Sequence, residues 1–402
     1  MKLSQREKRH IRLLFICNTW EGRGAEQQLS DLRRSLPERI RTDIFIFTMH
    51  DNGLLRFISQ DSTHIPAIFA FRRNRLFKSL ALLMLLTKNR YDVVVTEGLG
   101  SALFFGRMFA MLCGVPVIYS TQHTYENLNR KDGRYFEPPN MLLNRILLYF
   151  RFKRALRFLP VFNGLAERLR AQVPKYPIDT LWNAISENYI NRLQTHVPSN
   201  NVRLIREWCA GCATVIHVGT LDRNKNHIFM LKCIHEIREK VPNVRYIIVG
   251  EGPERSRLVS FVEKAGLSQH VQFSGQIGRM DCLYLIKHSK IMVLTSFSEA
   301  FPNVFLEAQI CSIPIVSFAV GGASEVILDG ETGFLTPMNS VSKFNNRVVD
   351  LLTNPDLAKK MGERGNQHFL DHFTMNMKSE KLVSLIESDL TRRKKQEDAF
   401  RV

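Results

Sequence analysis

The chain lacks any long uninterrupted apolar run. Among its 402 residues, the nearest approach to a membrane-spanning segment is Ala102–Tyr119, which is broken by Arg107, Gly114 and Pro116 and falls short of the roughly 18 apolar residues that a bilayer requires. The run Ile11–Cys17 follows basic residues, but it is short and has no small-residue cleavage pattern. It therefore predicts a first strand rather than a signal peptide. We expect a cytoplasmic protein, with any membrane contact peripheral and on the cytoplasmic face of the inner membrane.

Acidic residues are scarce relative to basic ones. There are 38 Asp and Glu against 56 Lys and Arg, a net charge of +18. Such a surplus indicates an anionic partner, which is nucleic acid, a membrane surface or a phosphorylated substrate. The surplus is uneven, because residues 1–195 hold 30 basic and 16 acidic side chains whereas residues 196–402 hold 26 and 22. The two halves of the chain therefore face different partners.

Signals for a metal site or a disulfide framework are missing. The seven cysteines are odd in number and lie mostly in apolar segments, as is typical of reduced buried thiols. Cys209 and Cys212 form a lone CxxC without a second pair, and no Asp-x-Asp occurs anywhere. We therefore predict no metal site.

The chain alternates short apolar runs with Gly- or Ser-rich turns and helical periods. Strands that read as continuous apolar runs are typical of parallel sheets covered by helices on both faces. The runs are Ile11–Cys17, Ile44–Thr48, Val93–Thr96, Val117–Ser120, Val161–Phe162, Thr214–Val218, Arg245–Val249, Val271–Phe273, Ile291–Leu294 and Ile315–Phe318. They predict an α/β fold of two Rossmann-like doubly wound domains that face each other across a cleft. We place the first domain at residues 1–195, the second at 196–370, and a C-terminal helix with a charged tail at 371–402, with no strand after Gly333.

The segment Ser296–Ala308 follows a predicted strand and carries the sharpest signal. Pro302 and Asn303 are residue types that begin helices, so backbone N–H groups at this turn point toward the cleft and suit a diphosphate. Glu307 lies one turn into the helix and could accept hydrogen bonds from two neighbouring hydroxyls, as on a ribose. Glu299 lies in the preceding loop, nearer a reacting sugar. A surface helix with incidental acids is the alternative.

This segment closely resembles the donor-site signature of the retaining glycosyltransferases of family 4. Glu299 and Glu307, separated by seven residues, are followed by Ile313-Pro-Ile-Val, Gly321-Gly-Ala-Ser-Glu-Val and Asp329-Gly-Glu-Thr-Gly-Phe-Leu335. Residues 213–337 carry most of the resemblance. It implies a GT-B architecture, in which the second Rossmann-like domain binds a nucleotide-sugar donor and the first binds the acceptor.

The resemblance also implies roles for single residues. Glu307 would bind the donor ribose, and Glu299 the transferred sugar or its phosphates. Four residues would contact donor oxygens through their backbone: Ala300, Phe301, Asn303 and Val304. The family often has glycine where this chain has Ala300, whose methyl group narrows the loop without altering the carboxylates.

Two further loops of the second half are candidates for donor binding. Lys225 presents a point charge, and the resemblance implies that it neutralises the leaving diphosphate; a solvated loop lysine is the alternative. The family's usual arginine position is occupied by Thr220, so we expect Arg223 or another basic side chain to compensate. Gly250 and Gly252 by themselves indicate only a tight turn. In the family context they line the nucleotide side of the cleft.

Gly24 and His123 are the candidates of the first half. Gly24 precedes a helix that follows the first strand, where the backbone can approach a ligand and the helix dipole favours phosphate; a plain turn is the alternative. His123 follows a strand, and the family's recurrent histidine at this point implies contact with the sugar. His217 and His227 are expected to be structural.

Residues 141–162 contain five basic side chains among apolar and aromatic ones, and no acid. This composition suits the interface of an anionic membrane, where arginine heads meet phosphates. A core helix with a basic solvated face is the alternative. The positive surplus of the first half leads us to favour the membrane, where lipid-linked acceptors lie.

These features predict a retaining glycosyltransferase that moves a hexose or N-acetylhexosamine from a nucleotide-sugar to a lipid-linked or saccharide acceptor in surface polysaccharide or lipopolysaccharide biosynthesis. The resemblance favours UDP. The nucleotide-sugar is a co-substrate, and we expect no cofactor. We also expect no metal, because positive side chains and helix N-termini would neutralise the negative charge of the leaving diphosphate.

Two rivals stay open. A nucleotide-sugar epimerase of the same fold needs no acceptor and leaves residues 141–162 unexplained. A non-catalytic basic protein that binds membrane or nucleic acid leaves the spaced glutamates without a role. Because the aromatic residues mostly lie in strand-like runs, we do not expect a nucleic-acid partner.

Overall fold

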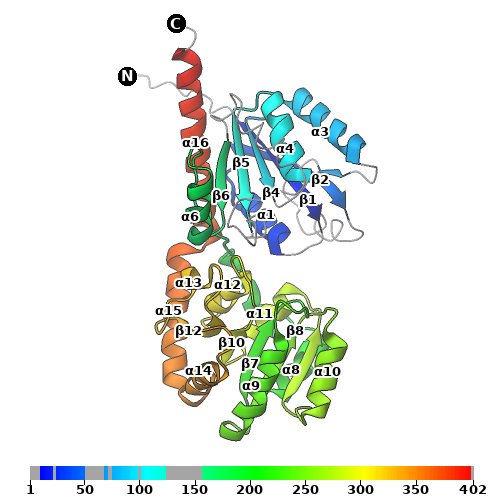
Figure 1. Ribbon diagram of the computed structural model, residues 1–402, viewed down its shortest axis with the longest axis vertical. Coiled ribbons are helices and arrows are strands. Elements are labelled where there is room, and N and C mark those ends of the chain that lie inside the picture. The colour runs from blue at the N-terminus through cyan, green and yellow to red at the C-terminus, as the bar shows by residue number, and fades with distance from the viewer. Residues whose placement is uncertain are drawn as a thin grey trace. The chain divides into compact units, whose positions relative to one another are not determined.

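The computed structural model describes residues 10–20, 24–49, 68–70, 75–97, 101–123 and 156–399, and the chain divides into two compact units (Figure 1). The first unit comprises Met1–Asn183 and Met375–Val402, and the second comprises Ala184–Thr374. Within these residues, each unit contains a six-stranded sheet whose paired strands are parallel. The predicted α/β class with two doubly wound sheets is confirmed.

The sheet of the first unit has the strand order β3-β2-β1-β4-β5-β6. Its strands are β1 (Ile11–Trp20), β2 (Ile40–Met49), β3 (Ile68–Ala70), β4 (Val93–Glu97), β5 (Val117–Gln122) and β6 (Leu156–Pro160). Its described helices are α1 (Gly24–Ser35), α3 (Arg75–Asn89), α4 (Ser101–Leu112), α6 (Asn163–Gln172) and α16 (Met375–Ala399). Residues 13–16 of β1 and 93–95 of β4 are buried, as their unbroken apolar sequence predicts for central strands covered on both faces.

The sheet of the second unit has the order β12-β11-β10-β7-β8-β9. Its strands are β7 (Ala213–Val218), β8 (Val244–Val249), β9 (Val271–Gly275), β10 (Ile291–Leu294), β11 (Ile315–Phe318) and β12 (Gly333–Thr336). Its helices are α7 (Asn188–Gln194), α8 (Asn200–Trp208), α9 (His227–Lys240), α10 (Arg255–Lys264), α11 (Arg279–Lys287), α12 (Asn303–Ile310), α13 (Ala323–Val326), α14 (Val341–Thr353) and α15 (Pro355–His372). Helix α15 illustrates the local cause of a boundary, because Asn354 caps the N–H of Leu357 and Pro355 occupies the first position.

Both sheets are wound in the same way. In each unit the first strand lies in the middle of the sheet, the next two strands are added on one side of it, and the last three are added on the other side. The order reverses between β1 and β4 in the first unit and between β7 and β10 in the second. In sheets of this kind, ligands bind beyond the carboxyl ends of the strands at the point of reversal. The loops that follow β7 and β10 are therefore the expected site in the second unit.

The structure differs from the sequence-based description in several boundaries. The second unit begins at Ala184 rather than at residue 196, and residues from Met375 onward belong to the first unit. The strand expected at Val161–Phe162 lies just upstream, as β6. Strands β3 and β12 were not expected.

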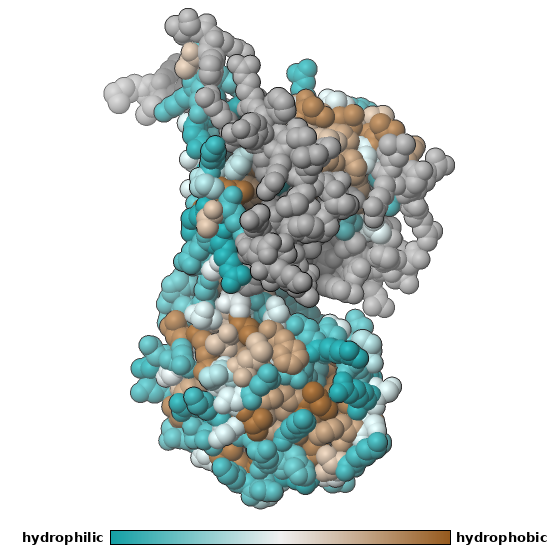
Figure 2. Space-filling view, viewed as in Figure 1, coloured by the Kyte–Doolittle hydropathy of each residue, from teal (hydrophilic) through white to brown (hydrophobic). Residues whose placement is uncertain are grey.

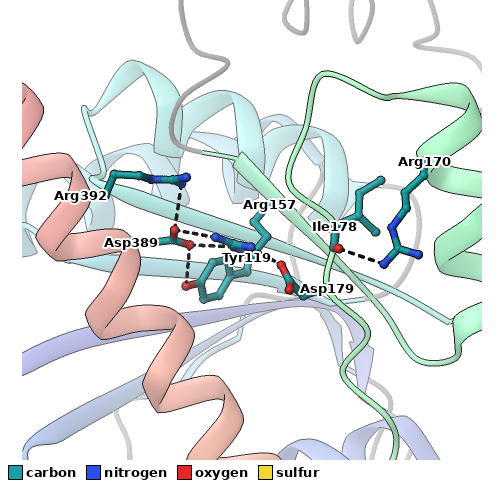
Figure 3. A network of polar contacts seen from close by, with 7 residues as sticks. All are labelled: Tyr119, Arg157, Arg170, Ile178, Asp179, Asp389 and Arg392. Carbon is teal, nitrogen blue, oxygen red and sulfur yellow. Dashed lines mark hydrogen bonds and ion pairs between the residues drawn. The ribbon is translucent and has the colours of Figure 1, made fainter.

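Helix α16 is joined to the sheet of the first unit by a partly buried charge network (Figure 3). Arg157 of β6 donates two hydrogen bonds to the Asp389 carboxylate, of 2.8 Å from Nε and 2.7 Å from Nη2. Tyr119 of β5 donates a third, of 3.1 Å, and Arg392 a fourth, of 2.9 Å. Arg157 also pairs with Asp179. The contact between a guanidinium and a carboxylate that share two hydrogen bonds is strong and directional. The C-terminal helix is therefore an integral part of this unit.

The same network corrects part of the membrane prediction for residues 141–162. Residues 124–155 lie outside the described residues. From Leu156 onward the segment forms β6, in which Leu156, Phe158 and Leu159 are buried and Arg157 is paired with carboxylates of the protein itself. This end of the segment is a core strand, because its apolar residues pack in the sheet and its arginine has internal partners.

Helix α3 exposes an apolar stripe. Phe77, Leu80 and Met84 are 40%, 49% and 61% exposed, and their spacing places them on one face of the helix. An apolar patch is visible at the position of α3 in Figure 2. Within the described ranges, no helix combines the length and the apolar character needed to cross a bilayer.

Candidate active site

The loops that follow β7 and β10 are joined by hydrogen bonds. The N–H of Phe297 donates to the carbonyl of Asn224 over 2.8 Å, and the Asn224 amide donates to the carbonyl of Ser298 over 2.9 Å. The Thr295 hydroxyl donates to the carbonyl of Lys225 over 3.1 Å. These contacts fix two loops from different parts of the sequence at the point of strand reversal.

Lys225 and Glu299 meet where these loops join. Lys225 Nζ lies 2.5 Å from Glu299 Oε1, and the two side chains are only 21% and 12% exposed. Asp222 accepts a hydrogen bond of 3.0 Å from the Lys225 backbone N–H, and the aliphatic stem of the lysine lies against Gly219. The structure therefore brings together the residue predicted to neutralise phosphate and the residue predicted to contact the transferred sugar.

Gly321 and Gly322 support the Glu299 loop from behind. Gly321 has φ of +53°, and a Cβ atom added there would lie 1.6 Å from the carbonyl oxygen of Glu299. The N–H of Gly322 donates to the carbonyl of Ala300 over 2.7 Å. Only glycine allows this approach at residue 321, and the two glycines thereby fix the backbone of Glu299 and Ala300.

Helix α12 begins directly after this loop. Pro302 has extended backbone, with φ of −71° and ψ of 108°, and the helix starts at Asn303. The first turn of a helix presents N–H groups and the positive end of the helix dipole, which suits an anion. Phe301 is buried and packs edge-on against Phe373, with ring centroids 5.7 Å apart. The four residues predicted to contact donor oxygens lie together at this turn: Ala300, Phe301, Asn303 and Val304.

Glu307 is accompanied by an arginine that the sequence did not reveal. Arg279, the first residue of α11, has its Nε 3.3 Å from Glu307 Oε1, with side chains 20% and 12% exposed. Its guanidinium lies over the ring of Tyr189 in α7, 4.2 Å from the centroid, and donates to the Tyr189 hydroxyl over 3.1 Å. Arg279 belongs to no sequence motif. The one feature of the sequence that could have indicated a role for Arg279 is its position after a strand, at the start of a helix.

Gly250 and Gly252 have a packing role. Gly250 has φ of +138°, and a Cβ atom there would lie 2.0 Å from the carbonyl oxygen of Gly219. At Gly252 it would lie 2.5 Å from the carbonyl oxygen of Leu221. The turn after β8 thus packs on the loop that carries Lys225. The Arg223 side chain is 88% exposed, with its Nε 3.6 Å from Glu254.

His217 and His227 form a buried pair in the second unit. Their ring centroids are 4.0 Å apart, both side chains are almost fully buried, and His217 Nδ1 lies 3.0 Å from the Tyr246 hydroxyl. Burial lowers the pKa of both rings, to about 4 for His227, and the charge of Lys225 acts in the same direction. Both are neutral core residues at physiological pH, in agreement with the structural role expected for them.

The remaining predicted residues, His123 and Gly24, belong to the first unit. His123 directly follows β5, and its Nε2 lies 2.9 Å from Oε2 of Glu97 at the end of β4. Burial by itself would raise the pKa of Glu97, but the hydrogen bond from His123 and the charges of His123 and Lys378 hold it below its ordinary value. Gly24 is the first residue of α1, so the helix begins one residue earlier than expected. Glu97 was missed, because it ends an apolar strand without a recognisable motif.

Both halves of the chain match known families. Residues 210–368 match the family described as Glycosyl transferases group 1, and residues 22–189 match the family described as Glycosyltransferase Family 4. The chain therefore belongs to the family 4 glycosyltransferases and is an enzyme with the GT-B fold.

Individual relatives share part of the sequence and the whole fold. N-acetyl-alpha-D-glucosaminyl L-malate synthase of Bacillus anthracis is 28% identical over 216 residues, so the chain spans about half the length of this relative, 54%. UDP-Gal:alpha-D-GlcNAc-diphosphoundecaprenol alpha-1,3-galactosyltransferase of Escherichia coli is 24% identical over 315 residues, 76% of this chain and 78% of that one. The crystal structure of Anabaena HepE in complex with UDP has a TM-score of 0.77 at 18% identity, covering 94% of this chain and 100% of that one.

Proposed function

We propose that this enzyme transfers a hexose or N-acetylhexosamine from a UDP-sugar to a lipid-linked or saccharide acceptor, with retention of the anomeric configuration, in surface polysaccharide or lipopolysaccharide biosynthesis. The observation that carries this proposal is the buried Lys225–Glu299 pair, fastened at the strand reversal of the second unit beside the start of α12. A cation and a helix N-terminus suit a diphosphate, and a carboxylate accepts hydrogen bonds from the hydroxyls of a sugar.

The donor would lie across these groups. Its diphosphate would bind at the start of α12. There, backbone N–H groups and Lys225 would stabilise the negative charge that develops on the phosphate as its bond to the sugar breaks. Glu307, one turn into α12, would accept hydrogen bonds from the ribose hydroxyls, and Glu299 would contact the transferred sugar. The exposed guanidinium of Arg223 is the candidate for the phosphate contact that Thr220 cannot make. With this positive charge, the reaction would need no metal.

The proposed reaction keeps the stereochemistry of the donor. The acceptor hydroxyl would attack the anomeric carbon on the face from which the diphosphate departs, and the departing phosphate would take up the hydroxyl proton. The new glycosidic bond forms as the bond to phosphate breaks, so atoms and charges balance without a protein nucleophile. Exclusion of water around the bound donor would limit hydrolysis.

The choice of UDP and of the acceptor is supported by the relatives. HepE was crystallised with UDP, and the Escherichia coli relative is named for a UDP-galactose donor and a diphosphoundecaprenol-linked acceptor. A peripheral position at the cytoplasmic face of the inner membrane agrees with the positive surplus of residues 1–195 and with the exposed apolar stripe on α3.

The donor site can be tested by ligand-induced thermal stabilisation. UDP at 100 times its dissociation constant would stabilise the wild type by about 2.7 kcal/mol, and GDP and ADP are the comparison ligands. Glu307→Ala should abolish the shift, whereas the exposed Glu363→Ala in the same unit should retain it. A wild type that is folded but stabilised by none of the three nucleotides would contradict the proposal.

A further inference from the structure

A cluster of charged side chains lies at the carboxyl ends of β4 and β5 in the first unit. Glu97 ends β4, His123 follows β5, and Lys378 comes from the first turns of α16. Together with Asp31 of α1, these are the charged groups that face one another from the four elements packed here. The donor residues named in the proposed function all belong to the second unit, so this cluster is a separate set of residues.

The contact between Glu97 and His123 fixes the histidine tautomer. The pKa of Glu97 is held below its ordinary value, so the group is a carboxylate at neutral pH and can only accept a hydrogen bond. His123 Nε2, 2.9 Å away, must therefore carry the proton. When the ring is neutral, its lone pair is on Nδ1, to which the described residues make no hydrogen bond.

The charge of Lys378 also acts to lower the pKa of Glu97. Its Nζ donates to the side chain of Gln28 in α1 over 3.3 Å. Burial lowers the pKa of Lys378 to about 8, although the charges of Glu97 and Asp31 act to raise it. At neutral pH the ammonium of Lys378 therefore compensates the charge of the Glu97 carboxylate, which pairs with His123.

The cavity beside this cluster is small and mixed in character. It is lined by the polar side chains of Glu97, Thr121, His123 and Lys378 over an apolar floor that includes Phe15. Its volume of about 20 Å³ is close to that needed by one water molecule. A single hydroxyl group fits such a space, and a sugar ring does not.

We propose that Glu97 and Lys378 are positioning residues, which hold His123 so that its Nδ1 accepts a hydrogen bond from one hydroxyl of the saccharide substrate. The identity of the ligand as a saccharide rests on the proposed function. The arrangement of Glu97, His123 and Lys378 comes from the first unit alone.

The test combines kinetics with nitrogen spectroscopy of the histidine rings. Release of UDP is measured with UDP-glucose, UDP-galactose and UDP-N-acetylglucosamine, in water and with mono- and disaccharide acceptors, from pH 6 to 9. Glu97→Gln and Lys378→Met should each lower kcat/KM by about tenfold or more, which is the scale of a lost hydrogen bond to a charged group. The stabilisation by UDP should stay as in the wild type. Lys381→Met is the control, because this lysine of the same helix lies over the Trp182 ring and does not line the cavity.

Long-range proton–nitrogen correlation spectra report the tautomer directly. In the wild type His123 should carry its proton on Nε2, and Glu97→Gln should remove this preference; His123→Gln identifies the signals. A proton on Nδ1 in the wild type would overturn the inference, as would wild-type kcat/KM in both variants of an active enzyme. If the wild type neither binds UDP nor releases it, the proposed function fails, while the tautomer still tests the geometry of the cluster.

Discussion

The two units share one strand order but assemble their polar sites from different parts of the chain. In the second unit, Lys225 and Glu299 lie in two loops that are hydrogen-bonded to each other, and Glu307 follows in the next helix. In the first unit, Glu97 and His123 are joined by Lys378, which comes from the far end of the sequence. The comparison teaches that sheet topology fixes where a site lies, whereas the spread of its residues along the chain is free to vary.

Asp389→Ala tests how strongly the first unit depends on its C-terminal helix. The substitution leaves Arg157 buried without its double hydrogen bond, and breaking a buried pair in this way costs about 3–5 kcal/mol. Denaturant unfolding measures the loss. Asp398→Ala, at an exposed position of the same helix, should cost less than about 0.5 kcal/mol. Equal stability of the two variants would mean that the network does not anchor α16.

Lys225→Ala tests the electrostatic role of the second unit. Removal of a preorganised positive group from a developing negative charge should lower kcat by about 10²- to 10³-fold, measured as UDP release. Lys264→Ala, at an exposed position of the same unit, should be as active as the wild type. Turnover within twofold of the wild type would show that Lys225 is a loop residue without a role at the phosphates.

Gly321→Ala tests whether the site of the second unit depends on close packing against the backbone of the Glu299 loop. The new methyl group would collide with the Glu299 carbonyl at a residue with positive φ, so we expect a loss of about 2–3 kcal/mol in stability and weaker binding of UDP. Gly330→Ala is the control, with φ of +78° but no atom within 4 Å. It should cost about 1 kcal/mol. Thermal unfolding with and without UDP distinguishes the two, and equal effects would contradict the packing argument.

The buried histidine pair gives the second unit a pH dependence. The folded-state pKa values of His217 and His227 lie below the ordinary value of 6.5, so the unfolded chain binds more protons below that pH. Stability should therefore fall as the pH is lowered from about 6.5 toward 4, by about 1.4 kcal/mol per pH unit for each histidine. His227→Phe should reduce this slope, whereas His288→Phe, at an exposed position, should not. Urea unfolding at pH 7 and pH 5 measures the slopes.

The sequence predicts most of the second unit's site because its residues lie in contiguous motifs. Glu299, Glu307 and Lys225 each follow an apolar strand, so their place at the sheet edge could be inferred before their contacts were known. Arg279 could not be inferred, because its distance to Glu307 depends on how two helices pack. The packing role of Gly250 and Gly321 likewise depends on backbones that approach only in the folded chain.

The polar contacts of the first unit were harder to predict, because they too form between residues that meet only in the folded chain. Arg157 looked like one of several arginines of a membrane segment, and its partner Asp389 lies 232 residues away. Lys378 looked like an ordinary residue of an amphipathic helix, although α16 returns to pack on the first unit. Charge pairing over such separations leaves no local pattern.

The stereochemistry of the product tests the central claim most directly. The wild type is incubated with UDP-α-hexoses and UDP-α-N-acetylhexosamines, together with saccharide and lipid-linked acceptors, and the anomeric proton of the transferred sugar is read by NMR. The account predicts an α-linked product from one of these donors, formed without added metal and lost in Lys225→Ala. A β-linked product, or transfer that is unchanged in Lys225→Ala, would contradict it.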